Sequence, residues 1–155
     1  FETVVKEVMN KREIVQVLLD AVQKGEFKHV EDMLTDDFQF SGPLPAPINA
    51  AIWLNMSNSM KAAFPDLHYH FKVIGTEGTI VRATMQMSGT HHAPFDLSAV
   101  NMGLIPTTHK TFSAAIQKLR ITVTGEKISL WAVESTDRGD LAAVLGQLGV
   151  KPVTA

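Results

Sequence analysis

The stretch IVRATMQMSGT, residues 80–90, decides the expected fold. Every second residue in it is small or apolar, and His91 continues the alternation. Because successive side chains of a β-strand point to opposite faces, these positions share one face of the strand. They are Val81, Ala83, Met85, Met87, Gly89 and His91. We therefore expect a strand whose apolar face lines the interior of the protein, with His91 pointing inward at the rim.

Similar strand patterns stand on both sides of this stretch. Leu67, Tyr69, Phe71 and Val73 alternate with polar residues, which predicts a strand with His68 and His70 on its other face. Short turns are expected at residues 75–78 and at Gly125, and a long loop with two prolines at 93–108. Short turns between neighbouring strands favour antiparallel pairing. The two later strands are expected over 111–123 and 128–135.

Helical patterns stand at the two ends of the chain. Apolar residues at helical spacing predict helices over about 2–24 and 26–34, with Gly25 between them. Asp36 and Asp37 are expected to break the second helix, before a short strand at 38–40. Residues 41–47 hold three prolines and predict a stiff loop. A third helix is expected from a cap at Asn49 to Pro65, and a last one after Thr136 or Asp137, with an apolar stripe of Leu141, Val144, Leu145 and Leu148.

The order of these elements predicts the fold class. Helices come first, antiparallel strands follow, and no repeat or linker divides the chain. Such segregation is typical of an α+β domain whose N-terminal helices cover one face of a curved antiparallel sheet. With 155 residues we expect one domain over 1–155.

Composition excludes several classes of function. The formal net charge is −2 and basic residues are scattered, so neither nucleic acid nor an acidic membrane surface is an expected partner. The chain has no cysteine, which excludes disulfides and thiolate chemistry. No apolar run reaches the roughly 18–20 residues of a membrane span. The chain begins at Phe1 without a signal-like apolar segment, so the expected location is the cytoplasm.

Short motifs in this chain resemble one known family. They stand at the strand entries and ends, in the order that the family has them. They are Phe64-Pro65-Asp66-Leu67, Gly89-Thr90-His91, Ile105-Pro106-Thr107, Glu126-Lys127-Ile128 leading to Trp131, and Gly146-Gln147-Leu148-Gly149. Together they resemble the SnoaL-like polyketide cyclases, within the nuclear-transport-factor-2-like superfamily, over roughly residues 10–150.

The resemblance implies a cone-shaped sheet around a deep apolar pocket. Relatives include cyclases, isomerases, dehydratases, epoxide hydrolases and members without known catalysis, so the fold does not fix the function. The cyclases use an acidic residue on the strand expected here at 111–123. That strand holds no Asp or Glu, and Gln117 or Leu119 stands near the position of the acid. Neither side chain can abstract a proton.

Three polar residues are candidate catalytic groups. His91 could act as a general acid or base, because the pKa of imidazole lies near neutral pH. Glu134 shares the parity of Ile128 in the last expected strand and could supply the missing carboxylate, with Gln117 orienting the substrate. The alternatives are a hydrogen-bonded structural histidine and a strand-end glutamate that reaches solvent or Arg138.

Aromatic and methionine side chains suit flat apolar ligands and are the expected pocket lining, with core packing as the alternative. The set is Phe40, Trp53, Met56, Met60, Met85, Met87 and Trp131. His68 and His70 have the spacing to reach one metal ion, but no third ligand is indicated. We therefore expect no metal site and no cofactor.

Two functions remain open on these observations. The first is a cofactor-independent cyclase, isomerase or hydrolase that acts by acid/base chemistry on a small hydrophobic or polyketide-like carbonyl compound. The second is a non-catalytic member of the fold that binds a small apolar molecule or serves as a scaffold. In either case we expect a homodimer formed through the outer face of the sheet.

Overall fold

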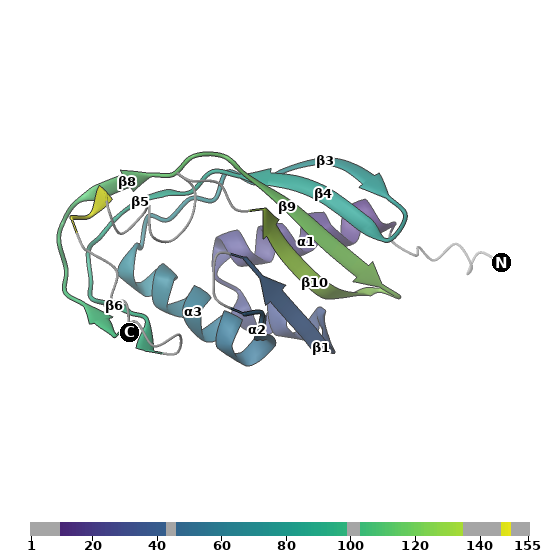
Figure 1. Cartoon of the computed structure of the whole chain (residues 1–155), viewed down its shortest axis with the longest axis horizontal. Coiled ribbons are helices and arrows are strands. Elements are labelled where there is room, and N and C mark those ends of the chain that lie inside the picture. The colour runs from purple at the N-terminus through teal and green to yellow at the C-terminus, as the bar shows by residue number, and fades with distance from the viewer. Residues whose placement is uncertain (1–9, 43–45, 99–102, 135–146, 150–155) are drawn as a thin grey trace.

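The computed structural model describes residues 10–42, 46–98, 103–134 and 147–149, and the account below concerns these residues. Two helices come first, two strands and a third helix follow, and the other strands of a strongly bent sheet come after them (Figure 1). The helices are α1 (Lys11–Lys24), α2 (Phe27–Asp32) and α3 (Ala50–Ala63). The strands are β1 (Leu34–Ser41), β2 (Ile48–Asn49), β3 (Lys72–Glu77), β4 (Ile80–Met85), β5 (Ser88–Thr90), β6 (Phe95–Asp96), β7 (Leu104–Ile105), β8 (Thr111–Ser113), β9 (Gln117–Thr124) and β10 (Lys127–Glu134).

The main sheet has the strand order β2-β1-β10-β9-β4-β3. The hairpins β3–β4 and β9–β10 and the pair β4–β9 are antiparallel, as the short turns predict. Strands β1 and β10 pair in parallel, which the sequence did not indicate because they lie far apart along the chain. The α+β class with a curved sheet is confirmed, and this one pair makes the sheet mixed.

The bend of the sheet comes from breaks in its two long strands. The expected strand 80–90 divides into β4 and β5, and the expected strand 111–123 divides into β8 and β9. Figure 1 shows both ribbons curving away from the main sheet before they pair again as β5 and β8. The apolar alternation continues through the first break, so the expected face of residues 81–91 stays on the inside. Met87 on that face is half-buried, and its other members are buried.

Side-chain caps set the beginnings of two helices. Asn10 is extended (ψ 169°), and its side chain accepts a hydrogen bond from the Glu13 amide while Glu13 binds the Asn10 amide in return. The helix was expected to start near residue 2, but Asn10 caps it and α1 begins at Lys11. Residues 1–9 lie outside the described part. Asn49 caps α3 as expected, by accepting from the Ile52 amide.

Three local expectations were wrong. Helix α2 ends at Asp32, and Asp36 and Asp37 lie exposed within β1 instead of breaking a helix. Residues 67–71 form only an isolated bridge, and β3 begins at Lys72 and continues through Gly75 to a turn at Gly78. The expected loop 93–108 contains the antiparallel pair β6–β7. Most of the expected C-terminal helix lies outside the described residues, of which Leu148 is buried.

The core fills the space between the helices and the inner face of the sheet. Its largest completely buried side chains come from α1, the residue that ends α3, the inner sheet face and the segment around β6. In β9 the inward positions alternate regularly with exposed ones, and the inward ones are Gln117, Leu119, Ile121 and Val123. None of the described helices is long and apolar enough to cross a membrane. This arrangement places the inner sheet face opposite α3, where the cavity lies.

Candidate functional site

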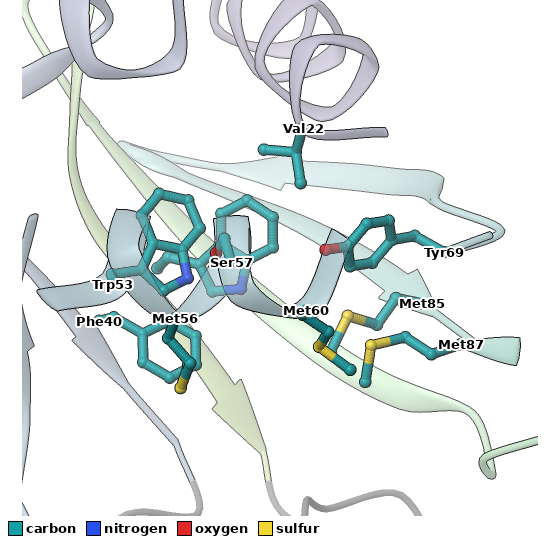
Figure 2. A pocket seen from close by; sticks show the side chains of 10 residues that line it. Val22, Phe40, Trp53, Met56, Ser57, Met60, Tyr69, Met85 and Met87 are labelled. Carbon is teal, nitrogen blue, oxygen red and sulfur yellow. The ribbon is translucent and has the colours of Figure 1, made fainter. Parts of the chain in front are cut away.

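A cavity of about 90 Å³ lies between α3 and the inner face of the sheet. Figure 2 shows Met60, Met85 and Met87 at one end of it, and Phe40, Trp53 and Met56 at the other. Ten residues from α1, α3, the sheet and the segments beside it form its walls. They are Val22, Phe40, Trp53, Met56, Ser57, Met60, Tyr69, Met85, Met87 and Trp131.

The structure brings all seven sequence-predicted pocket residues together around this cavity. Sequence reasoning missed Val22, Ser57 and Tyr69. Ser57 was recognisable, because it lies one turn after Trp53 on the same helical face. Tyr69 was assigned to the core face of its segment, and its burial agrees with that assignment.

Aromatic rings form a continuous wall along the cavity. Trp53 stacks on Phe40 at 6.0 Å between ring centroids and meets Trp131 at 5.1 Å. Trp131 in turn contacts Phe71 at 5.8 Å, and Phe71 stacks on Tyr69 at 4.8 Å. Such contacts favour tilted and offset ring geometries and hold the rings in place. The wall is therefore a rigid, polarisable surface suited to a flat ligand.

Among the residues that the structure describes, the walls carry hydrogen-bond donors but no carboxylate or imidazole. The indole Nε1 of Trp131 is buried and has no hydrogen-bond partner among the described residues. Burial raises the pKa of Tyr69, so its phenol stays protonated at neutral pH. Figure 2 shows the Tyr69 hydroxyl pointing toward Ser57 and α3. The cavity can thus donate hydrogen bonds to a ligand oxygen, but the described part of its lining offers no base that works at neutral pH.

His91 is completely buried but is not among the residues that line this cavity. Its ring lies 5.2 Å from that of Phe64 between centroids. Its Nδ1 lies 3.0 Å from the Thr108 hydroxyl oxygen and accepts from the Thr108 amide at 3.2 Å. An amide N–H can only donate, so a neutral His91 carries its proton on Nε2. That Nε2 is buried and has no partner among the described residues. In this tautomer the free nitrogen of His91, Nε2, can donate a hydrogen bond but cannot accept a proton.

The burial of His91 predicts a loss of stability in mild acid. Burial of the imidazole is the main cause that lowers the pKa of His91. The Ala93 backbone raises this pKa, whereas the charges of His109 and His92 lower it further. Between the folded pKa and the unfolded value of about 6.5, the unfolded chain binds more protons. The free energy of unfolding should therefore fall as the pH drops below about 6.5, by at most about 1.4 kcal/mol per pH unit for this one group.

Urea unfolding of the His91→Gln variant between pH 7.5 and 5 tests this expectation. The variant should show a shallower decline than the unaltered chain, because glutamine does not titrate. His29 is exposed, so His29→Gln is the matched control and should leave the decline unchanged. Equal declines in the unaltered chain and in His91→Gln would contradict the assignment.

Glu134 and Gln117 lie apart from the cavity lining. A bulge between Ile128 and Leu130 reverses the parity of β10, so Glu134 does not share the inward face of Ile128 as expected. Its carboxylate lies 3.5 Å from Arg120 Nε, and both side chains are more than a third exposed. Gln117 is buried on the inner face opposite Met85, and its Nε2 has no partner among the described residues.

Comparison with solved structures shows the fold. AclR from Streptomyces galilaeus, a proposed hydroxylase, has 17% identity and a TM-score of 0.70 over 90% of this chain and 95% of that one. IdmH from Streptomyces antibioticus, a proposed polyketide cyclase, has 22% identity and a TM-score of 0.68 over 92% and 100%. A SnoaL-like polyketide cyclase from Agrobacterium tumefaciens has 16% identity and a TM-score of 0.65 over 92% and 100%.

Comparison of sequences adds the family. No curated protein sequence matches this chain. The model of the SnoaL-like polyketide cyclases matches residues 12–148, a range that includes every strand described above. This chain therefore belongs to the SnoaL-like polyketide cyclase family.

Proposed function

We propose that this protein binds a small, flat, mostly apolar carbonyl compound in the cavity between α3 and the sheet. The observation that carries the proposal is the composition of the walls, in which aromatic rings and four methionines surround a few hydrogen-bond donors. Apolar walls with a small number of polar groups are typical of small-molecule sites. A carbonyl oxygen accepts hydrogen bonds, so a wall that supplies hydrogen-bond donors suits its recognition.

The size of the cavity limits the ligand. An engineered apolar cavity of roughly 150 Å³ holds benzene, so about 90 Å³ admits one ring only if neighbouring side chains move. Methionine side chains are unbranched and adaptable, and four of them line this cavity. The proposed ligand therefore has a single ring or an equivalent flat unit, and a larger polyketide would enter only in part.

The Trp131 indole is proposed to donate to the ligand carbonyl. We expect Trp131→Phe to weaken acetophenone binding by about three- to tenfold more than binding of α-methylstyrene, because a neutral hydrogen bond contributes about 0.5–1.5 kcal/mol. The two probes have nearly the same size and branching, and only acetophenone carries an oxygen. Isothermal titration with each probe measures the difference.

Phe40→Leu is the matched control for this experiment. It trims an apolar ring in the wall of the same cavity and removes no hydrogen-bond donor, so it should weaken both probes alike. An equal loss for both probes in Trp131→Phe would remove the indole from the recognition of the carbonyl. Failure of the unaltered chain to bind either probe would overturn the proposed function itself.

A second candidate function is proton transfer without a cofactor, with His91 as donor and Gln117 as an orienting group. The supporting observation is that both are buried with an unpartnered nitrogen. The exposed position of Glu134 favours its role as an ion-pair partner of Arg120 over a role beside His91. The His91→Gln variant tests this candidate too. If His91→Gln loses turnover of a bound carbonyl compound but keeps its affinity for that compound, the result supports catalysis. Unchanged turnover would exclude a catalytic role for His91.

Assembly as a homodimer through the outer sheet face stays part of the proposal. That face carries the exposed cations Lys118 and Arg120 in β9, next to the half-buried Arg82 of β4. Ion pairs with Glu77 and Glu134 neutralise two of the three. A second copy would therefore meet a largely compensated polar surface.

A further inference from the structure

Two exposed histidines lie in direct contact just before β3, away from the cavity. The rings of His68 and His70 are 3.8 Å apart between centroids, and His68 Nδ1 lies 2.8 Å from His70 Nε2. His70 Nδ1 lies 2.8 Å from the carbonyl oxygen of Gln86. The proposed ligand site uses none of these atoms.

The backbone brings the two rings together at a cost. In a regular strand, residues two apart share a face but their side chains stand roughly 7 Å apart. His70 has a φ of +50°, in the left-handed region that residues other than glycine seldom occupy. The left-handed turn replaces the regular strand at 67–71. A strained conformation at an exposed position is a reason to look for a function.

The Gln86 carbonyl determines where the protons are. A carbonyl oxygen can only accept, so His70 Nδ1 carries a hydrogen and points it at Gln86. In neutral His70 the Nε2 then accepts, which makes His68 Nδ1 the donor between the rings. The remaining nitrogen, His68 Nε2, is unprotonated. One nitrogen of each ring thus faces the other ring, with a single hydrogen between them.

We propose that His68 Nδ1 and His70 Nε2 chelate a divalent transition-metal ion of tetragonal preference, Ni²⁺ or Cu²⁺. Two nitrogens in neighbouring positions of a square plane, each at about 2.0 Å from the ion, lie about 2.8 Å apart, whereas a tetrahedral Zn²⁺ site needs about 3.3 Å. The hydrogen bond between the rings already holds the two nitrogens 2.8 Å apart, close to the separation that the square plane needs. Rotation of the rings then aims both lone pairs at the ion.

Binding of the ion needs no added acid or base, because the displaced proton stays on His68. The ion replaces the hydrogen on His68 Nδ1, which moves to the free Nε2 of the same ring, so two neutral imidazoles bind it with no net proton release. His70 keeps its Nδ1–H donated to Gln86. A hydrogen bond of this kind fixes the ring and raises the basicity of a metal-bound imidazole.

We expect water to occupy the coordination positions of the ion that the two histidines leave open. The described residues contain no group of three histidine, cysteine or carboxylate side chains that could hold an ion. The site is therefore an open one, with two ligands from the protein and exchangeable positions toward solvent. The sequence spacing alone argued against a metal because it indicated neither the contact between the rings nor the bond to Gln86.

Titration calorimetry with Ni²⁺ on the untagged full chain at pH 7.5 tests the proposal. We expect one ion per chain, bound more tightly than Zn²⁺, and a loss of at least about tenfold in affinity in both His68→Asn and His70→Asn. Asparagine tolerates the left-handed conformation, so His70→Asn should keep the fold, and urea unfolding checks this. His29→Asn changes an exposed histidine elsewhere and should leave the Ni²⁺ affinity unchanged.

Unchanged Ni²⁺ affinity in His68→Asn or His70→Asn overturns the site, as does the absence of saturable binding to the unaltered chain. A loss of the same size in His29→Asn also overturns it. Tighter binding of Zn²⁺ than of Ni²⁺ would overturn the proposed tetragonal geometry.

Discussion

Replacing Phe64 with alanine is expected to lower the free energy of unfolding by about 3–5 kcal/mol. The side chain is completely buried at the end of α3 and contacts three rings. Its centroid lies 5.4 Å from Phe95, 5.1 Å from Phe112 and 5.2 Å from His91. Removal leaves a cavity where α3, β6 and β8 meet. Chemical denaturation at pH 7.5 measures the loss.

The surroundings of Phe64 explain why the loss should be near the upper end of that range. A Cβ added to Gly89 would lie only 3.3 Å from Phe64 Cβ, so the backbone of β5 already packs closely against this residue. Asp66, two residues on, accepts the Thr90 amide at 2.8 Å and ties the same strand to the end of the helix. These contacts hold the walls apart and limit their collapse into the vacated space.

Two variants serve as controls for this prediction. Phe64→Leu keeps part of the apolar volume and should cost less than alanine. Ile74 is 54% exposed on β3, and Ile74→Ala should change stability by no more than about 0.5 kcal/mol. A cost below about 1 kcal/mol for Phe64→Ala would mean that this junction is not packed as described.

Alternating apolar residues were sufficient to predict which face of the sheet is buried. The face of residues 81–91 remains inside although the strand breaks after Met85, because two residues intervene before β5 and the parity is kept. Trp53, Met56 and Met60 were expected in the pocket lining because aromatic and methionine side chains suit apolar ligands, and all three line the cavity from α3. The spacing of apolar residues indicates which face of an element is buried, and these predictions concerned only which side chains are buried.

Features that depend on a single backbone irregularity could not be predicted in this way. One extra residue in β10 between Ile128 and Leu130 turns Glu134 to the outside, and no residue type in that stretch announces the bulge. The left-handed φ of His70 is another such feature, since a histidine pair at this spacing also fits a regular strand. The expectation that Glu134 points inward was wrong because of the bulge in β10. It assumed an unbroken strand parity.

Replacing Ser57 with leucine is expected to abolish acetophenone binding while leaving the fold intact. Ser57 is buried on α3 and lines the cavity. Leucine adds carbon atoms to a space of only about 90 Å³, so little room remains for a ligand ring. Filling an apolar cavity commonly stabilises a protein by about 0.5–2 kcal/mol, and leucine also has a higher helix propensity than serine. Affinity and stability should therefore change in opposite directions.

This opposition is what makes the variant informative. A misfolded variant would lose binding and stability together, whereas a filled cavity removes binding and keeps or raises the free energy of unfolding. Asn58→Leu places the same side chain on the exposed face of the same helix and should leave acetophenone affinity unchanged. Calorimetry with acetophenone and urea unfolding measure the two quantities. If Ser57→Leu folds and still binds acetophenone with the original affinity, the ligand occupies another part of the molecule, and the cavity between α3 and the sheet is core packing.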